Sequence, residues 1–246
     1  MPRTALTIDA PDGACTATLH TPEGDGPWPG VIMFVDAGGV RETFLDMADH
    51  LAGLGHAVLL PDVYYRAGGF APFDMSTVFG DEAERRRLAA LMSDLTSERV
   101  AADAAVYAST LLARPEVSGS RIGTTGYCMG GKASLTAAGA LGDTIGAAAS
   151  FHGGGLAVAD DPSSPVHRAG GLTATVLVAG AENDGSFGPE QADLLEKTLT
   201  ERGVSHTVET WPGAHGFAVT DNPTYDPALQ ERHWAAMADL YRTVLA

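Results

Sequence analysis

The sequence predicts a single α/β domain over residues 1–246, with a mostly parallel central sheet and helices on both faces. Strand-like and helix-like segments alternate along most of the chain, which is typical of parallel sheets. Several strand-like segments are continuously apolar, as expected of strands buried on both faces. The length of 246 residues is enough for one sizeable core.

The first half of the chain contains two predicted buried strands with a helix between them. The strands are the apolar runs "GVIMFVDA" (30–37) and "HAVLLPDV" (56–63). The helix, "RETFLDMADHLAGLG" (41–55), has apolar residues at helical spacing and ends at Gly55. Before them, "CTATLHTP" (15–22) alternates in polarity, which predicts an edge or early strand.

The second half continues the alternation after a helix that begins at Thr96 or Ser97 and runs to about Arg114. The later predicted elements are a strand over 121–125, a helix directly after it, strands over 145–153 and 173–180, a helix over 189–202, a strand over 205–211 and a last helix from about Pro227. Right-handed crossovers would place the carboxyl ends of the parallel strands at one edge of the sheet.

Residues 64–96 interrupt this alternation with several aromatic residues and then "ERRRLAALM" (84–92). We expect the segment to lie over the carboxyl edge of the sheet. It forms either part of a pocket wall or an ordinary packed loop with a short helix, and the sequence does not favour one over the other.

Composition excludes several classes of protein. With 45% hydrophobic and 19% charged residues, the chain is globular rather than disordered. A net charge of −16 argues against nucleic acid and anionic membranes as partners. Two cysteines exclude a disulfide framework, and no apolar run approaches the roughly 20 residues of a membrane span. We therefore expect a cytoplasmic protein with no cofactor, and the oligomeric state stays open.

The segment "GYCMGGK" (126–132) fits two different motifs. As G-x-x-x-x-G-K it would be a phosphate-binding loop, but the hydroxyl that should follow the lysine is replaced by Ala133. As G-x-S-x-G with cysteine in place of serine it would be a nucleophile elbow, the sharp turn between a strand and a helix that exposes a catalytic side chain. The second interpretation is favoured.

An elbow at Cys128 makes demands that the sequence meets. Side chains two residues on either side would clash, and these positions are Gly126 and Gly130. The turn would place the thiol at a helix amino end, where N–H groups stabilise an anion. The N–H of Met129 would be one oxyanion donor, and that of Ala37, after an earlier strand, the second.

An elbow also requires an acid and then a histidine later in the chain. Asp184 follows the strand over 173–180, with Glu182 as a rival acid. His215 follows the last predicted strand. Cys128, Asp184 and His215 therefore occur in the order nucleophile, acid and base.

Other candidate residues carry less specific signals. Cys15 is interpreted as a small core residue. His152, in "SFHGGG" after a strand, is a candidate for the pocket wall. No H-E-x-x-H motif or Cys/His pair at ligand spacing occurs, so no metal site is predicted.

The sequence resembles the dienelactone hydrolase family of α/β-hydrolases over nearly the whole chain. The resemblance lies in the order of five segments, which are "LLPDVYYR", the elbow, "SFHGGG", the Asp184 segment and "PGAHGF". The resemblance implies a Cys128–His215–Asp184 triad. It also implies an acidic residue that modulates the resting thiol, at the position of Asp36, which is one methylene shorter than the glutamate frequent there. Further candidates for the substrate pocket are Tyr64, Arg66, Phe73, Arg85 and Phe217.

The arginine that holds a substrate carboxylate in the dienelactone enzymes has no equivalent here, since Val219 lies near its place. Arg66 or one of Arg85, Arg86 and Arg87 is the alternative cation, but the sequence favours a solvent-exposed helix face for the "ERRR" run (84–87). The predicted activity is hydrolysis of a small ester or lactone, as by a carboxymethylenebutenolidase, through a thioacyl-enzyme. The alternatives are a non-catalytic ligand-binding or sensor protein on the same fold, and a thiol redox protein.

Overall fold

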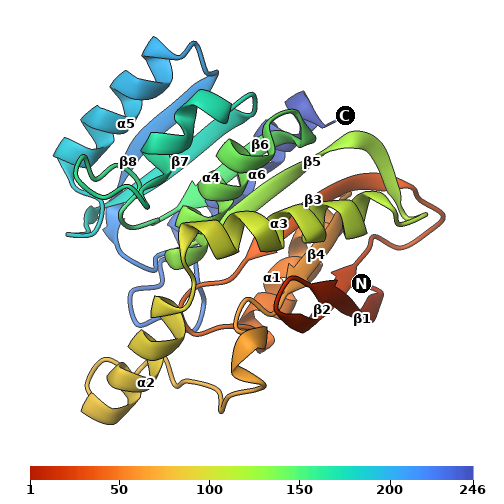
Figure 1. Cartoon of the computed structure of the whole chain (residues 1–246), viewed down its shortest axis with the longest axis horizontal. Helices are drawn as coiled ribbons and strands as arrows, with labels where there is room; N and C mark the ends of the chain where they lie inside the picture. The colour runs from red at the N-terminus through yellow and green to blue at the C-terminus, as the bar shows by residue number, and fades with distance from the viewer. Residues whose placement is uncertain (246) are drawn as a thin grey trace.

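A computed structural model describes residues 1–245 and has an eight-stranded sheet at its centre (Figure 1). The strand order is β1-β2-β4-β3-β5-β6-β7-β8, antiparallel between β1, β2 and β4 and parallel elsewhere. The strands are β1 (Arg3–Ala10), β2 (Gly13–His20), β3 (Trp28–Phe34), β4 (Ala57–Pro61), β5 (Val117–Tyr127), β6 (Ile145–Phe151), β7 (Thr175–Asn183) and β8 (His206–Ala214). The predicted fold class is confirmed.

Helices cover both faces of the sheet (Figure 1). They are α1 (Glu42–Gly53), α2 (Glu82–Ser93), α3 (Ser97–Leu112), α4 (Met129–Leu141), α5 (Pro189–Glu201) and α6 (Pro227–Val244). Helices α3, α4 and α5 lie on one face, and α1 and α6 lie on the other, where His50 stacks on Trp234 with 4.2 Å between ring centroids. No helix within residues 1–245 is both long and apolar enough to cross a membrane.

Burial explains why these segments form these elements. Every residue of β4 and β6 is buried, as continuous apolar runs between two helical layers require. In α1 the buried residues include Phe44, Met47 and Leu51, which share one face at helical spacing. Helix α3 begins where Thr96 accepts a hydrogen bond from the N–H of Arg99, so Thr96 is its N-cap.

The first strand is the element that sequence patterns missed. β1 forms an antiparallel hairpin with β2 and is the edge strand of the sheet. Only Ile8 and Ala10 of β1 are buried, so its hydrophobic alternation is weak. Its pairing with β2 depends on backbone hydrogen bonds, which composition does not reveal.

Residues 64–96 project from one end of the sheet and carry the short 3-10 turn η1 (Tyr65–Ala67) and α2 (Figure 1). Four buried residues of this segment, Phe73, Met75, Val78 and Leu88, form a small separate cluster with Ala37. The excursion therefore packs through its own apolar contacts on the loop after β3.

Candidate active site

Cys128 lies in the sharp turn between β5 and α4. Its φ of 55° and ψ of −120° are values that a residue with a Cβ rarely adopts. A Cβ on Gly126 would lie 1.9 Å from the carbonyl oxygen of Gly130, and one on Gly130 would lie 2.4 Å from the carbonyl oxygens of Phe34 and Val35. Both glycines are therefore required by the close approach of backbones around the turn.

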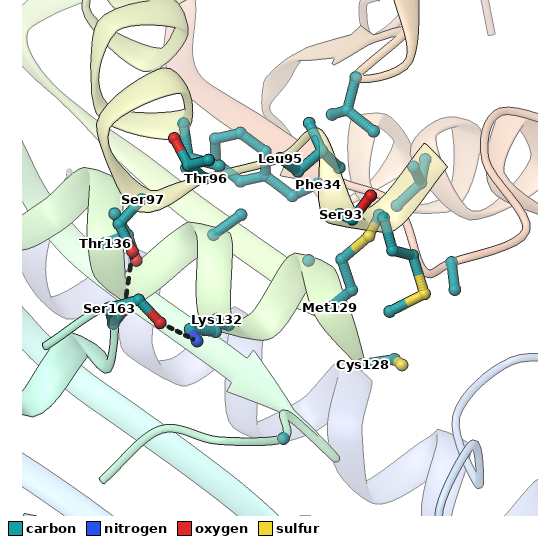
Figure 2. A pocket seen from close by; sticks show the side chains of 18 of the residues that line it. Phe34, Ser93, Leu95, Thr96, Ser97, Cys128, Met129, Lys132, Thr136 and Ser163 are labelled. Carbon is teal, nitrogen blue, oxygen red and sulfur yellow. Dashed lines mark hydrogen bonds between the residues drawn. The ribbon is translucent and has the colours of Figure 1, made fainter. Parts of the chain in front are cut away.

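The turn presents the Cys128 sulfur at the edge of a large cavity (Figure 2). The N–H of Cys128 donates to the carbonyl oxygen of Phe151 at 3.1 Å, which ties the turn to β6. Met129 is the first residue of α4, so the sulfur sits at the amino end of the helix. The aligned N–H groups there favour negative charge.

Asp184 and His215 meet at the same cavity from the ends of neighbouring strands. Asp184 directly follows β7, and His215 directly follows β8. Nδ1 of His215 lies 2.6 Å from Oδ2 of Asp184, whose side chain is 4% exposed. Oδ1 of Asp184 accepts from the N–H of Ser186 at 2.8 Å and from its hydroxyl at 2.6 Å. The rival acid, Glu182, is exposed.

These contacts shift the ionisation of both groups. Burial lowers the pKa of His215, but its interactions with Cys128 and Asp184 outweigh burial and raise the pKa to about 9. Burial raises the pKa of Asp184, but the hydrogen bonds from Ser186 and His215 outweigh it and bring the pKa below its usual value. Near neutral pH the pair is therefore an imidazolium beside a carboxylate.

The two predicted oxyanion donors also lie on this cavity, since Ala37 and Met129 both line it with Cys128. Tyr64 connects them. Its hydroxyl donates to the carbonyl oxygen of Ala37 at 2.9 Å and lies 3.3 Å from the sulfur of Met129. Tyr64 is 3% exposed. This candidate for the pocket wall is therefore buried, and its hydrogen bond holds the loop after β3.

Asp36 belongs to an ion-pair network. Its Oδ1 and Oδ2 accept from the guanidinium of Arg41 at 2.6 and 2.9 Å, and Oδ1 also accepts from the N–H of Gly38 at 2.9 Å. Arg41 in turn donates to Asp221 at 2.6 and 2.8 Å. Both oxygens of Asp36 are thus occupied, and a direct action on the thiol would require this ion pair to open.

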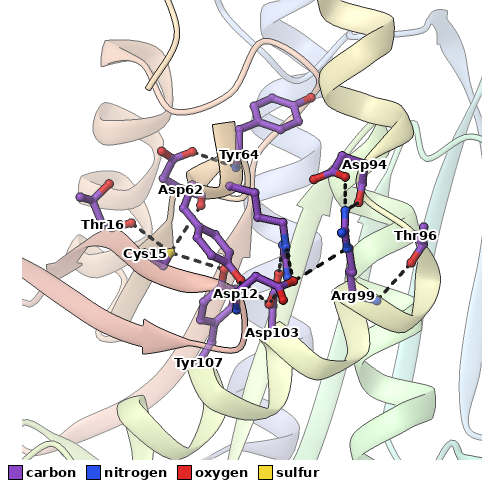
Figure 3. A network of polar contacts seen from close by, with 12 residues as sticks. Asp12, Cys15, Thr16, Asp62, Tyr64, Asp94, Thr96, Arg99, Asp103 and Tyr107 are labelled. Carbon is purple, nitrogen blue, oxygen red and sulfur yellow. Dashed lines mark hydrogen bonds and ion pairs between the residues drawn. The ribbon is translucent and has the colours of Figure 1, made fainter. Parts of the chain in front are cut away.

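The arginines predicted as alternative carboxylate ligands are engaged elsewhere or exposed. Arg66 donates to Asp103 at 2.7 and 2.8 Å and to Asp12 at 2.7 Å; Figure 3 shows both acids in this network. Arg85 is exposed on α2. Among its neighbours, Arg86 pairs with Glu82, and Arg87 pairs with Glu84 and lies over the ring of Phe73.

The other two predicted pocket residues pack behind the triad. The ring of His152 lies 5.2 Å from that of His215 and 5.0 Å from that of Phe217, measured between centroids. His152 is fully enclosed, and burial, followed by the charge of His215, holds its pKa well below the usual value. It is therefore a neutral packing partner of His215, and Phe217 is fully buried.

The cavity beside Cys128 has a volume of about 860 Å³. Sequence reasoning named few residues of its wall, which comes mostly from β3, α4, α3, the end of α2 and the segment between α2 and α3. The missed residues include Phe34, Met92, Leu95, Val100, Tyr107, Lys132 and Thr136. Apolar residues that face a cavity have the same helical spacing as residues that face a core, so no sequence signal separates them.

No group of three or more His, Cys, Asp or Glu side chains within residues 1–245 is placed to hold a metal ion.

Comparison with known proteins agrees with this arrangement. The model of the dienelactone hydrolase family matches residues 15–245. The chain belongs to the dienelactone hydrolase family. This confirms the resemblance drawn from the sequence motifs, and the protein is a dienelactone hydrolase-like hydrolase.

Among its relatives are two bacterial proteins provisionally named as carboxymethylenebutenolidases. The one from Methylorubrum extorquens is 26% identical over 239 residues, covering 96% of this chain and 79% of that protein. The one from Escherichia coli K12 is 27% identical over 224 residues, covering 89% of this chain and 79% of that protein.

Two solved structures superpose over the whole chain. m3DLH is 26% identical, with a TM-score of 0.82 and coverage of 100% of this chain and 99% of that one. The dienelactone hydrolase-like promiscuous phosphotriesterase P91, from metagenomic libraries, is 27% identical, with a TM-score of 0.75 and full coverage of both chains.

Proposed function

We propose that the protein hydrolyses a small ester or lactone, as the names of its carboxymethylenebutenolidase relatives suggest, with Cys128 as the nucleophile. One observation carries the proposal. Cys128 is held in a strained turn at a helix amino end, on the same cavity as a His215 whose Nδ1 contacts Asp184. Strain of this kind persists only where the surrounding structure enforces it.

In the first half of the reaction, the Cys128 sulfur attacks the ester carbonyl carbon. The cationic His215 favours the negative charge on the sulfur, and Asp184 holds the imidazole in the required orientation. The tetrahedral intermediate collapses when the carbon–oxygen bond breaks and His215 gives its proton to the departing alcohol. The product is a thioacyl-enzyme on Cys128.

In the second half, the now neutral His215 takes a proton from water, which attacks the thioester carbon. The carbon–sulfur bond breaks, the acid leaves, and the Cys128–His215 pair is restored. During both steps the N–H groups of Ala37 and Met129 hold the oxyanion, and each donor lowers the barrier by roughly 3 kcal/mol.

Mass spectrometry of the intact protein during turnover of p-nitrophenyl acetate tests this proposal. We expect nitrophenolate release and a transient acetyl adduct that peptide mapping places on Cys128. Cys128→Ala should lose both, whereas Cys15→Ala should keep both, because Cys15 is fully buried against Tyr107 and the carbonyl oxygen of Asp62. Equal esterase rates in Cys128→Ala and the wild type would refute the nucleophile.

A further inference from the structure

The cavity extends well beyond the reacting sulfur, and most of its wall is apolar. Figure 2 shows Cys128 on one side and a polar group of Ser97, Thr136 and Ser163 on the other. Phe34 and Leu95 also line the cavity. A volume of about 860 Å³ is far more than an acetyl group needs.

Among the described residues, the cavity wall offers no unpaired cation. Within residues 1–245 it contains no arginine and one lysine, Lys132, one helical turn after Cys128. Nζ of Lys132 donates to the hydroxyl of Ser163 at 2.9 Å and lies 3.6 Å from Oδ2 of Asp161. The same hydroxyl donates to Asp161 at 2.8 Å, so the positive charge of Lys132 already has a counter-ion.

The remaining charges around the cavity are acidic or paired. The cationic His215 on the wall pairs with Asp184. Asp103 and Glu98 also lie on the wall, and they pair with Arg66 and Arg168 respectively. A substrate carboxylate in this cavity would lose its hydration without gaining a free cation, which is unfavourable. The whole chain, at −16, adds further repulsion.

We propose that the substrate is an uncharged ester with a long apolar acyl chain, such as an octanoyl chain, laid along this cavity, and that chains ending in a carboxylate are rejected. This inference rests on the hydrolytic function proposed above and narrows its substrate class. It predicts a preference opposite to that of an enzyme built to hold a substrate carboxylate.

Three esters with one leaving group test the preference. They are p-nitrophenyl acetate, p-nitrophenyl octanoate and the mono-p-nitrophenyl ester of octanedioic acid. Each methylene that becomes buried strengthens binding by up to about fourfold, so kcat/KM should rise at least about tenfold from acetate to octanoate. The octanedioate should fall at least about tenfold below the octanoate. Equal rates for octanoate and acetate, or a preference for octanedioate, would overturn the proposal.

Two pairs of variants locate the preference. Thr136→Leu narrows the far side of the cavity and should lower kcat/KM for octanoate several-fold more than for acetate. Thr200→Leu makes the same change at an exposed position of α5 and should keep the octanoate-to-acetate ratio. An unchanged ratio in Thr136→Leu would contradict the path of the chain.

The lysine pair tests the charge argument. Lys132→Met should not reduce turnover of the octanedioate relative to that of the octanoate. The control is Lys197→Met, which makes the same change in the exposed Lys197–Glu201 pair on α5. Selective loss of octanedioate turnover in Lys132→Met would show that Lys132 is an anion site and would overturn the proposal.

Binding to Cys128→Ala separates this inference from the proposed function. Calorimetric titration should show tighter binding of methyl octanoate than of monomethyl octanedioate. If wild type turns over none of the esters but this binding preference holds, the hydrolytic function fails and the cavity preference stands. If esters are turned over without a chain preference, the function stands and this inference fails. The inference also fails if Cys128→Ala binds neither methyl ester.

Discussion

Replacing Asp184 by asparagine tests the triad with almost no change of shape. The N–H and the hydroxyl of Ser186 both donate to Oδ1 of Asp184, so the asparagine oxygen should take that place. Its NH₂ group would then face Nδ1 of His215, where Oδ2 now lies at 2.6 Å. Two donors cannot pair, so His215 is driven to the tautomer that carries its proton on Nε2, which is the wrong one for a base.

The expected loss is large because the contact is short and enclosed. In a Ser-His-Asp triad, the matching acid-to-amide change fixes the wrong tautomer and costs about 10⁴-fold in kcat, and we expect a loss of that order here. Loss of the carboxylate charge should also lower the pKa of His215 from about 9. The assay is the kcat for p-nitrophenyl esters together with the midpoint of the His215 resonance in an NMR titration.

Glu182→Gln is the matched control, because Glu182 is exposed and lies two residues before Asp184. It should change kcat by less than about threefold, within the small range of a surface substitution. If Asp184→Asn kept kcat within that range, or if Glu182→Gln fell as far as Asp184→Asn, the assignment of the acid would be wrong.

Three further predictions concern the groups around the triad. Tyr64→Phe removes the hydrogen bond to the carbonyl of Ala37 and should lower kcat about tenfold with little change in KM. Tyr241→Phe removes a similar bond, to the carbonyl of Thr124, and should cost stability but not kcat; equal kcat losses would refute a positioning role for Tyr64. Arg41→Met leaves Asp36 buried without a counter-ion and should lower the free energy of unfolding in urea by about 3 kcal/mol, against less than about 1 kcal/mol for the exposed Arg86→Met; similar losses in both would contradict the network. The pKa of His215 is raised to about 9 from 6.5, so the stability that its charge contributes is complete below about pH 6.5 and is lost as pH rises through about 9. The difference in Tm between wild type and His215→Gln should therefore shrink over that interval, and a constant difference would contradict the raised pKa.

Local sequence patterns predict much of this fold. Continuous apolar runs predicted β3, β4 and β6 because strands between two helical layers have no solvent-facing side. The glycines at 126 and 130 predicted the turn at Cys128, because only their lack of a Cβ allows the backbones to approach. Such signals can be found in the sequence because the residues that determine each element lie within it or within a few residues of it.

The parts that sequence reasoning missed depend on partners distant in the chain. The sequence made Arg66 a candidate ligand for the substrate carboxylate. In the structure its guanidinium pairs with Asp12 and Asp103, which lie 54 and 37 residues away in the chain. Tyr64 was a candidate for the pocket wall, whereas its hydroxyl reaches the carbonyl of Ala37. A charged or aromatic side chain has the same appearance in a sequence whether it contacts a ligand or a second loop.

Arg41 connects two loops that the proposed mechanism needs together. Asp36 lies at the start of the loop that carries Ala37, and Asp221 lies in the loop that follows His215. The guanidinium of Arg41 holds both carboxylates, with its side chain 9% exposed. Because a guanidinium makes rigid paired hydrogen bonds, the distance between these loops is restrained. The carboxylate at position 36 thus takes part in this restraint through its hydrogen bonds with Arg41. The shorter aspartate reaches this partner because Arg41 lies in the same loop.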